Sequence, residues 1–513
     1  MSELDPPDWF AEIPLAGSPD EYGHSQRPEP RSGLALSAEP LMPAAAAAPF
    51  LDPADPMTSA RQMVAARYMA GDLGTLKNWR DGFYEWTQTH WREVDRAAVE
   101  AAVWQYLDHA RRYDKNGDPL PFQPNRARVG DVSAALAAQC NLPAYVEAPA
   151  WLSTVDMPHA SELTPVANGL LHLVSGRLYP PTPSFFNLNS AGVAFDPDAP
   201  EPAEWLRFLN ELWGQDVQSI ETLQDVFGYL LSPDTSQQKI PLIVGPKRSG
   251  KGTIARVLTA LLGQASVGAP TLSGLSTNFG IEPLIGKSVA IVGDARLGGR
   301  ADQAVIAERL LQISGEDSLT IDRKHRAAWT GKLGVRFVIM SNELPRLNDA
   351  SGALSGRFIV ITMENSFFGR EDRGLLNRLL PELPGILNWS RAGYLRLSRR
   401  GYFLQPESAR DAIAELEALG SPIGAFLKQR CTVEPGLQCT PGRLFDTWRD
   451  WSADNGRKEP GTLQSFGRDL RAAVPGLRIV NPRVAGKQVR MYEGIDIAND
   501  ATSAALPIDG EPW

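Results

Sequence analysis

Residues Gly245–Thr253 read GPKRSGKGT, and they join two apolar segments of different periodicity. The run before them, Ile240–Val244, has the length of a buried strand, and the segment after them, Ile254–Leu258, has helical spacing. A strand, a glycine-rich loop and a helix in this order form a P-loop, whose backbone N–H groups and helix N-terminus bind nucleotide phosphates. The stretch therefore predicts a site for a nucleoside triphosphate. Its expected nucleotide-binding residues are Gly245, Pro246, Lys247, Arg248, Ser249, Gly250, Lys251, Gly252 and Thr253.

One position departs from the usual P-loop. Gly252 follows Lys251 where a serine or threonine normally binds Mg²⁺, and the first hydroxyl comes one place later, at Thr253. Lys251 is still expected to place its ammonium between the phosphates. The Mg²⁺ ion is then bound by Thr253 through a shifted loop, or mainly by acidic residues and water. The competing interpretation of the whole stretch is a glycine-rich surface turn.

Composition restricts the class of protein. The chain has 513 residues, enough for about three domains, and its 43% hydrophobic and 22% charged residues are typical of a globular protein. Its net charge of −9 excludes nucleic-acid binding through overall positive charge, so any such binding must be local. Three scattered cysteines exclude a disulfide framework, and neither a signal peptide nor a membrane span is seen. We expect a cytoplasmic protein.

Periodicity predicts an α/β fold with accessory domains. Apolar strand-like runs at Ile240–Val244, Ser288–Val292, Gly334–Met340 and Phe358–Met363 alternate with helical segments. Strands that alternate with helices predict a mostly parallel sheet in a three-layer domain. The expected parts are a disordered leader (1–56), a mainly α-helical N-terminal domain (57–203), the α/β domain (204–398), a linker (399–420), a winged-helix-like domain (421–498) and a tail (499–513).

The predicted N-terminal domain contains a dense cluster of aromatic residues. Its members are Trp79, Phe83, Tyr84, Trp86 and Trp91. Aromatic residues this close together usually form a core, and the alternative is a platform on which nucleic-acid bases stack.

Three polar residues follow or precede the predicted strands. Asp294 ends the apolar strand Ser288–Val292 in the manner of a Walker B acid, which holds Mg²⁺ and positions water. Asn342 comes two residues after the strand Gly334–Met340, at the carboxyl ends of the strands, where ligands bind in open α/β sheets. It is expected to contact the γ-phosphate or orient water. Arg357 precedes Phe358 and is a candidate arginine finger for a neighbouring subunit's nucleotide. Each has a simpler interpretation, as a strand-end acid, a turn asparagine or a solvent-exposed arginine.

A basic segment lies between Asp294 and Asn342 in the sequence. It contains Arg323, Lys324 and Arg326, with Lys332 and Arg336 close by in the sequence. Such a cluster predicts a loop that grips DNA phosphates, although a charge cluster is more often a solvated face.

The order and spacing of these elements resemble a known family. A P-loop, the Asp294 strand, GED followed by basic residues at 315–326, SNELP at 341–345 and the arginine of GRF at 356–358 resemble the superfamily 3 helicases, most closely the phage/plasmid primase-helicases that include poxvirus-type enzymes. The upstream phrases PPTPSFFNLN (180–189) and FGYLL (227–231) are similar to that group as well. The resemblance implies Walker A at Lys251 and Thr253, Walker B at Asp294, and sensor 1 at Asn342. It also implies an arginine finger at Arg357 and a DNA-tracking B′ hairpin at Lys324.

The resemblance further implies what the protein does. It implies an AAA+-like ATPase domain with a short helical collar, ATP and Mg²⁺ as cofactors, and a hexameric ring that moves 3′→5′ on single-stranded and forked DNA. The setting would be replication of a phage, prophage, plasmid or satellite element in a bacterial cytosol, with further replication partners bound through the C-terminal domain. Because no Asp-x-Asp cluster in a strand context precedes residue 230, we expect a helicase without primase activity.

Two other functions stay open at the level of the sequence. An AAA+-like replication initiator or DNA-binding regulator would bind ATP to assemble on DNA with little unwinding, and the single acid at Asp294 together with Gly252 is compatible with it. A nucleoside monophosphate kinase shares the GKGT ending at residues 250–253, but its P-loop lies near the N-terminus.

Overall fold

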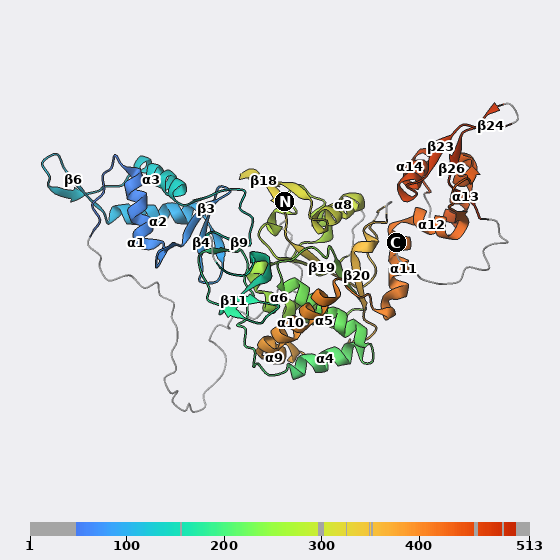
Figure 1. The fold of residues 1–513 in the computed structure, drawn as a ribbon, viewed down its shortest axis with the longest axis horizontal. Helices are drawn as coiled ribbons and strands as arrows, with labels where there is room; N and C mark the ends of the chain where they lie inside the picture. Colours follow the sequence, from blue (N-terminus) through green and yellow to red (C-terminus); the bar gives the residue numbers. More distant parts are fainter. Residues whose placement is uncertain are drawn as a thin grey trace. The chain divides into compact units, whose positions relative to one another are not determined.

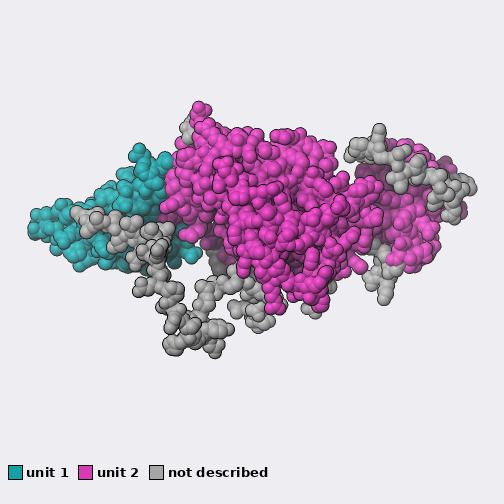
Figure 2. All heavy atoms as spheres, turned by 90° about the horizontal axis from the view of Figure 1, so that it is seen from below, with its two compact units in different colours: residues 1–78, 94–141 teal, residues 79–93, 142–513 magenta. Residues whose placement is uncertain are grey.

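The computed structural model describes residues 48–153, 156–295, 302–324, 326–347, 349, 352–455, 460–484 and 487–498. Most of the expected leader and the whole expected tail lie outside these residues. Internal contacts divide the chain into two compact units, residues 1–78 with 94–141, and residues 79–93 with 142–513 (Figure 2). Within the described residues, no helix is both long and apolar enough to cross a membrane.

The first unit is built on three helices. They are α1 (Pro56–Arg67), α2 (Arg96–Asp108) and α3 (Arg126–Gln139), accompanied by the short strands β1 (Met69–Ala70), β2 (Leu73–Gly74), β6 (Arg111–Tyr113) and β7 (Pro119–Pro121). Asp55 and Asn125 cap α1 and α3 by accepting hydrogen bonds from backbone N–H groups of the first turn.

The expectation of a mainly helical N-terminal domain over 57–203 is wrong. Residues 69–94 form strands, among them β3 (Leu76–Trp79), β4 (Gly82–Trp86) and β5 (Trp91–Val94), and further strands follow from β8 to β13. These later strands are β8 (Asn141–Leu142), β9 (Ala150–Trp151), β10 (Leu163–Val166), β11 (Gly169–His172), β12 (Leu178–Tyr179) and β13 (Phe185–Phe186). The physical reason is tertiary: Trp79 and Trp91 are buried around Phe186, and strands place these rings on one apolar face. The core interpretation of the aromatic cluster is confirmed for these residues.

The second unit contains a five-stranded parallel sheet, as the alternation predicted (Figure 1). Its strands run in the spatial order β15 (Val267–Gly268), β16 (Val289–Val292), β19 (Arg336–Ser341), β14 (Ile240–Val244) and β20 (Phe358–Thr362). The strands that carry the predicted motifs are therefore next to one another, with β19 between β14 and β16.

Helices cover both faces of this sheet. Alternate residues such as Ile243 and Ile291 pack with α4 (Ala203–Trp213), α5 (Val217–Leu231), α6 (Lys251–Leu262) and α10 (Leu383–Arg400). The intervening residues, such as Leu242 and Ile339, pack with α7 (Leu272–Leu275) and α8 (Gln303–Ser314). The period of two along each strand explains why both faces are apolar, since a parallel sheet is buried on both sides. A short helix, α9 (Leu375–Leu379), precedes α10.

Two further parts of the chain belong to this region. An antiparallel hairpin of β17 (Ser318–Arg323) and β18 (Arg326–Lys332) carries the basic segment. The expected linker, 399–420, contains the helix α11 (Arg410–Gly420), because Leu416 is buried against the same core as Leu354.

The C-terminal region has three helices and a small antiparallel sheet. The helices are α12 (Pro422–Arg430), α13 (Pro441–Asp454) and α14 (Leu463–Ala473). The sheet has the order β22 (Gln438–Cys439), β26 (Met491–Glu493) and β23 (Arg478–Val480), beside the pairs β21 (Cys431–Thr432) with β27 (Asp496–Ile497) and β24 (Arg483–Val484) with β25 (Lys487–Gln488). Phe426, Trp451 and Phe466 form its separate core.

Candidate nucleotide site

The glycine-rich loop leaves β14 at Gly245 and enters α6 at Lys251. A Cβ atom on Gly245 would lie 2.7 Å from the Cβ atom and from the carbonyl oxygen of Met363, so the loop passes directly against the end of β20. Gly250, the N-cap of α6, has a φ of 96°, in the left-handed region that favours glycine. These two positions therefore need glycine for different reasons, close approach in one case and backbone conformation in the other.

The loop folds around the ammonium of Lys251. The Lys251 Nζ donates hydrogen bonds to the Gly245 and Pro246 carbonyl oxygens at 2.7 and 2.8 Å and to Ser249 Oγ at 3.1 Å. Burial lowers the pKa of Lys251 to about 8, and the negative charge of Asp294 opposes that shift. The Lys251 ammonium thus lies within the loop, at the position where a P-loop binds phosphate.

Neighbouring segments hold the loop from outside. Ser366 Oγ donates to the Lys247 carbonyl oxygen at 2.8 Å, and the Phe367 N–H donates to the Arg248 carbonyl oxygen at 2.9 Å. On the other side, a Cβ atom on Gly250 would come within 3.1 Å of side-chain atoms of Phe208, which lies in α4. Packing on both sides fixes the loop before any ligand arrives, which lowers the entropic cost of binding. No local motif pointed to Ser366 or Phe367, because their role depends on contacts across the sheet.

Strand register brings Asp294 and Asn342 to the same edge of the sheet as the loop. Val244 pairs with Ser341, and the Gly245 N–H donates to the Ser341 carbonyl oxygen at 3.2 Å, so Asn342 follows directly beside the loop. Val292 pairs with Ile339, which places Asp294 level with Ser341 two residues later. The electrostatic effect of Asp294 on Lys251 agrees with this placement.

Arg357 lies at the other end of the strands, where the parallel strands begin. It immediately precedes β20, whose first residue Phe358 pairs with Ile240, the first residue of β14, whereas the loop follows the last residue of β14. A five-residue strand spans about 16 Å. The Arg357 Nη1 donates to the side-chain oxygen of Gln238. Arg357 therefore does not join Lys251, Asp294 and Asn342 within one copy of the chain.

The three predicted DNA-binding residues lie at the turn of the β17–β18 hairpin. Lys324 is exposed at the tip, Arg323 Nε donates to the Ala327 carbonyl oxygen at 2.8 Å, and Arg326 forms an ion pair with Glu93 at 2.5 Å. Further along β18, the Arg80 guanidinium lies over the rings of Trp79 and Trp329, at 4.6 and 5.2 Å from their centroids. Segment 79–93 therefore contacts the hairpin both near its tip and along β18.

Arg336 does not belong to this basic surface. It is buried and donates hydrogen bonds to the carbonyl oxygens of Tyr229 and Ser288. Its charge supports the backbone between α5 and β16, and desolvation lowers its pKa.

The oxygen donors near the loop suit a divalent cation. Mg²⁺ prefers oxygen ligands and keeps several waters, and the Thr253 hydroxyl and the Asp294 carboxylate are both groups of this kind. Among the described residues, no group of three His, Cys, Asp or Glu side chains is placed to hold a metal by itself.

Comparisons with known proteins match two parts of the chain. A family model described as "D5 N terminal like" matches residues 62–214, and a "Family of unknown function (DUF5906)" matches residues 243–357. One solved structure, "The A form apo structure of NrS-1 C terminal region-CTR", is 14% identical, with 86% of this chain and 100% of that chain covered and a TM-score of 0.46. Another apo structure of the same region gives 14% identity, 86% and 99% coverage and a TM-score of 0.46. Likenesses this remote assign no function by themselves.

Proposed function

We propose that this chain, which belongs to the phage primase-helicase family, is an ATP-driven DNA helicase that works as a ring. Family membership supports a role in DNA replication. The observation that carries the proposal is the arrangement of the motifs: Lys251, Asp294 and Asn342 meet at one edge of the sheet, and Arg357 lies at the other.

This arrangement supports a nucleotide site shared between two copies. Within one copy, Lys251 neutralises phosphate charge, Asp294 binds Mg²⁺ with Thr253 and orients water, and Asn342 contacts the γ-phosphate. Mg²⁺ supplies charge neutralisation at the phosphates when it is bound. Arg357 reaches this site only from a neighbouring copy, where its guanidinium stabilises the charge that develops as the γ-phosphoryl leaves the β-phosphate oxygen for water.

The exposed Lys324 at the hairpin tip supports coupling to DNA. In a ring, the hairpins of successive copies would present their Lys324 side chains to one strand, and hydrolysis around the ring would move them along it in the 3′→5′ direction. This local positive charge is compatible with the net charge of −9, because phosphate contacts need only a few cations. The winged-helix-like region 421–498 would add contacts to duplex DNA or to another replication protein.

The first test is ATP hydrolysis with and without single-stranded DNA. We expect strong stimulation by DNA, and we expect Lys251→Ala to lower the stimulated rate at least about 100-fold because a phosphate-binding cation is lost. Lys324→Ala should reduce the stimulation and leave hydrolysis without DNA unchanged. Lys115→Ala, which removes an exposed lysine elsewhere, is the matched control.

Unwinding assays then separate the proposal from its alternative. Forked substrates with a 3′ or a 5′ tail should be opened only with the 3′ tail. Gly252 removes the usual Mg²⁺-binding hydroxyl, and this favours the second candidate, an initiator that binds ATP to assemble on DNA. Assembly on DNA without strand separation would establish the initiator, and hydrolysis that ignores DNA would refute the helicase.

A further inference from the structure

A phenylalanine stands exposed at the rim of the nucleotide site. The side chain of Phe368 lies in the segment after β20 and is 77% exposed. It occupies a β-turn in which the Arg370 N–H donates to the Phe367 carbonyl oxygen at 2.8 Å, with Gly369 at a φ of 76°. The turn thus presents to water a large aromatic ring, a residue type that is enriched at the cores of protein interfaces.

This turn is attached to the P-loop. The Ser366 hydroxyl and the Phe367 N–H, which directly precede Phe368, donate to the carbonyl oxygens of Lys247 and Arg248. These two hydrogen bonds connect the turn to the loop. Whatever covers Phe368 therefore also lies against the rim of the nucleotide site.

An exposed arginine, Arg370, follows the phenylalanine on the turn. The carboxylate of Glu371 lies 3.5 Å from Arg248, and that of Asp372 lies 2.5 Å from Arg378, so both acids beside the turn are paired. Arg370 is exposed next to them. The surface thus combines an aromatic ring with an arginine, two residue types that are enriched at the centres of protein interfaces.

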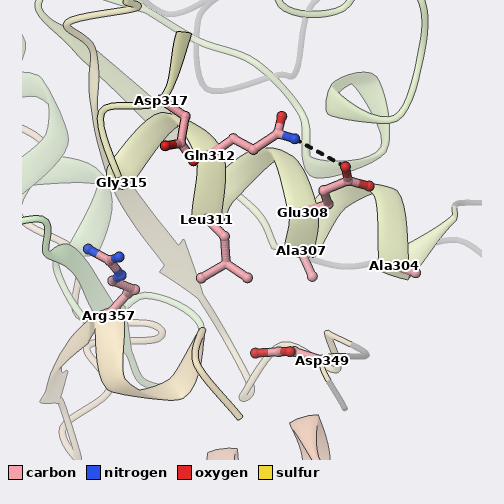
Figure 3. A pocket seen from close by; sticks show the side chains of 9 residues that line it. All are labelled: Ala304, Ala307, Glu308, Leu311, Gln312, Gly315, Asp317, Asp349 and Arg357. Carbon is pink, nitrogen blue, oxygen red and sulfur yellow. Dashed lines mark hydrogen bonds between the residues drawn. The ribbon is translucent and has the colours of Figure 1, made fainter. Parts of the chain in front are cut away.

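Arg357, at the amino-terminal end of β20, lines a pocket of complementary chemistry. Figure 3 shows its lining, and its volume is about 390 Å³. Its apolar part comes from α8, with Ala304, Ala307 and Leu311, and its acidic part is made of Glu308, Asp317 and Asp349. A cavity of roughly 150 Å³ accommodates benzene, so a phenyl ring fits in this pocket.

We propose that Phe368 of one copy inserts into this pocket of the next copy, with Arg370 against the acidic residues. The inference rests on the proposed function: Arg357 lines the pocket and must approach a neighbour's P-loop, and that same P-loop carries the Phe368 turn. A single arrangement of two copies therefore brings Arg357 to the neighbour's P-loop and the neighbour's Phe368 to the pocket. The turn follows the end of β20, whereas Arg357 in the pocket precedes its start. The contact is therefore head to tail, the kind of interface from which rings are built.

Two variants test the contact from its two ends. Phe368→Ala removes the ring, and Ala304→Trp fills the pocket from an exposed position on α8. With ATPγS and single-stranded DNA present, mass photometry should show rings for the unchanged chain. Each variant should need a concentration at least roughly 30-fold higher to assemble, as for a buried aromatic hot spot. Tyr145→Ala, at a site that is 84% exposed, is the control and should assemble normally.

Mixing the two variants gives the sharpest outcome. Phe368→Ala keeps an open pocket and Ala304→Trp keeps its phenylalanine, so the mixture should form dimers with one intact contact and no rings. As an independent check of charge, Arg370→Glu should weaken assembly and Glu308→Arg in the same chain should restore it. Thermal melting curves confirm that each variant is folded.

The results distinguish this interface from the proposed function. Normal assembly of Phe368→Ala, or an unchanged chain that stays single with ATPγS and DNA, would overturn the interface. Rings that depend on Phe368 but whose hydrolysis ignores DNA would support the interface and refute the helicase.

Discussion

Lys251 shows how a single side chain prepares the nucleotide site. The loop carbonyls surround its ammonium, and burial lowers its pKa to about 8. Bound phosphates would replace those carbonyls and favour the charged form, so binding should raise the pKa. Nucleotide binding is therefore expected to be coupled to proton uptake.

The first prediction is the size of that uptake. With a pKa of about 8, about half of the free lysines are neutral at pH 8 and about a tenth at pH 7, so ADP binding should take up about those fractions of a proton. Calorimetry in buffers of different ionisation enthalpy measures it. A binding heat at pH 8 that does not depend on the buffer would show that Lys251 is already charged in the free protein.

Gly252 is the second informative residue, because the structure leaves space there. A Cβ atom added at Gly252 would meet nothing within 4 Å. The absent hydroxyl is therefore not a steric requirement of the loop.

We predict that Gly252→Ser lowers the Mg²⁺ concentration for half-maximal hydrolysis several-fold, since it restores the usual ligand. Gly252→Ala is the control: it adds the Cβ atom alone and should stabilise α6 by about 0.5–1 kcal/mol without changing the Mg²⁺ dependence. Equal Mg²⁺ dependence of the two variants would mean that Thr253 or water already fills the role.

At the scale of elements, the contact between α5 and α10 depends on two glycines. A Cβ atom on Gly228 would lie 2.3 Å from the Tyr394 nitrogen and 2.5 Å from the Ser390 oxygen, and one on Gly393 would lie 2.2 Å from the Gln224 oxygen. The two backbones therefore approach without side chains between them.

Gly228→Ala should lower the free energy of unfolding by roughly 1–3 kcal/mol, because overpacking outweighs the gain in helix propensity. Urea denaturation measures the change. Gly130→Ala in α3, where a Cβ atom meets nothing, is the matched helical control and should not destabilise. Equal stability of the two variants would show that α5 and α10 separate at little cost.

Elements also show where the sequence was misleading. The strands β14, β16, β19 and β20 follow from continuous apolar runs, and all four were predicted within two residues of their observed bounds. The domain 57–203 was predicted to be mainly helical, but residues 69–94 form strands, because the arrangement of Trp79 and Trp91 around Phe186 depends on a segment about a hundred residues away.

For the whole molecule, the position of Arg357 is decisive. Its separation from the P-loop by the length of β14 predicts that Lys251 and Arg357 act from different copies. Mixing Lys251→Ala with Arg357→Ala should therefore restore DNA-stimulated hydrolysis from near zero to about a quarter of the normal rate. In random rings, about a quarter of the interfaces pair an intact P-loop with an intact finger. The measurement is the steady-state rate across mixing ratios, and no recovery at any ratio would place both residues in one functional copy.

The sequence by itself determined the local chemistry of this protein. The P-loop, the acid after β16 and the amide after β19 are each specified by a few adjacent residues, and parallel strands bring their carboxyl ends to one edge. The basic residues of the β17–β18 turn were likewise readable from the sequence.

Only the tertiary structure decided which distant residues meet. It placed Ser366 and Phe367 against the P-loop, buried Arg336 away from the hairpin surface, and put Arg357 at the end of β20 that is remote from the P-loop. The physical reason is that local signals come from neighbours within a few residues, whereas these contacts are fixed by strand order and by burial of apolar faces, which no short stretch of the chain encodes.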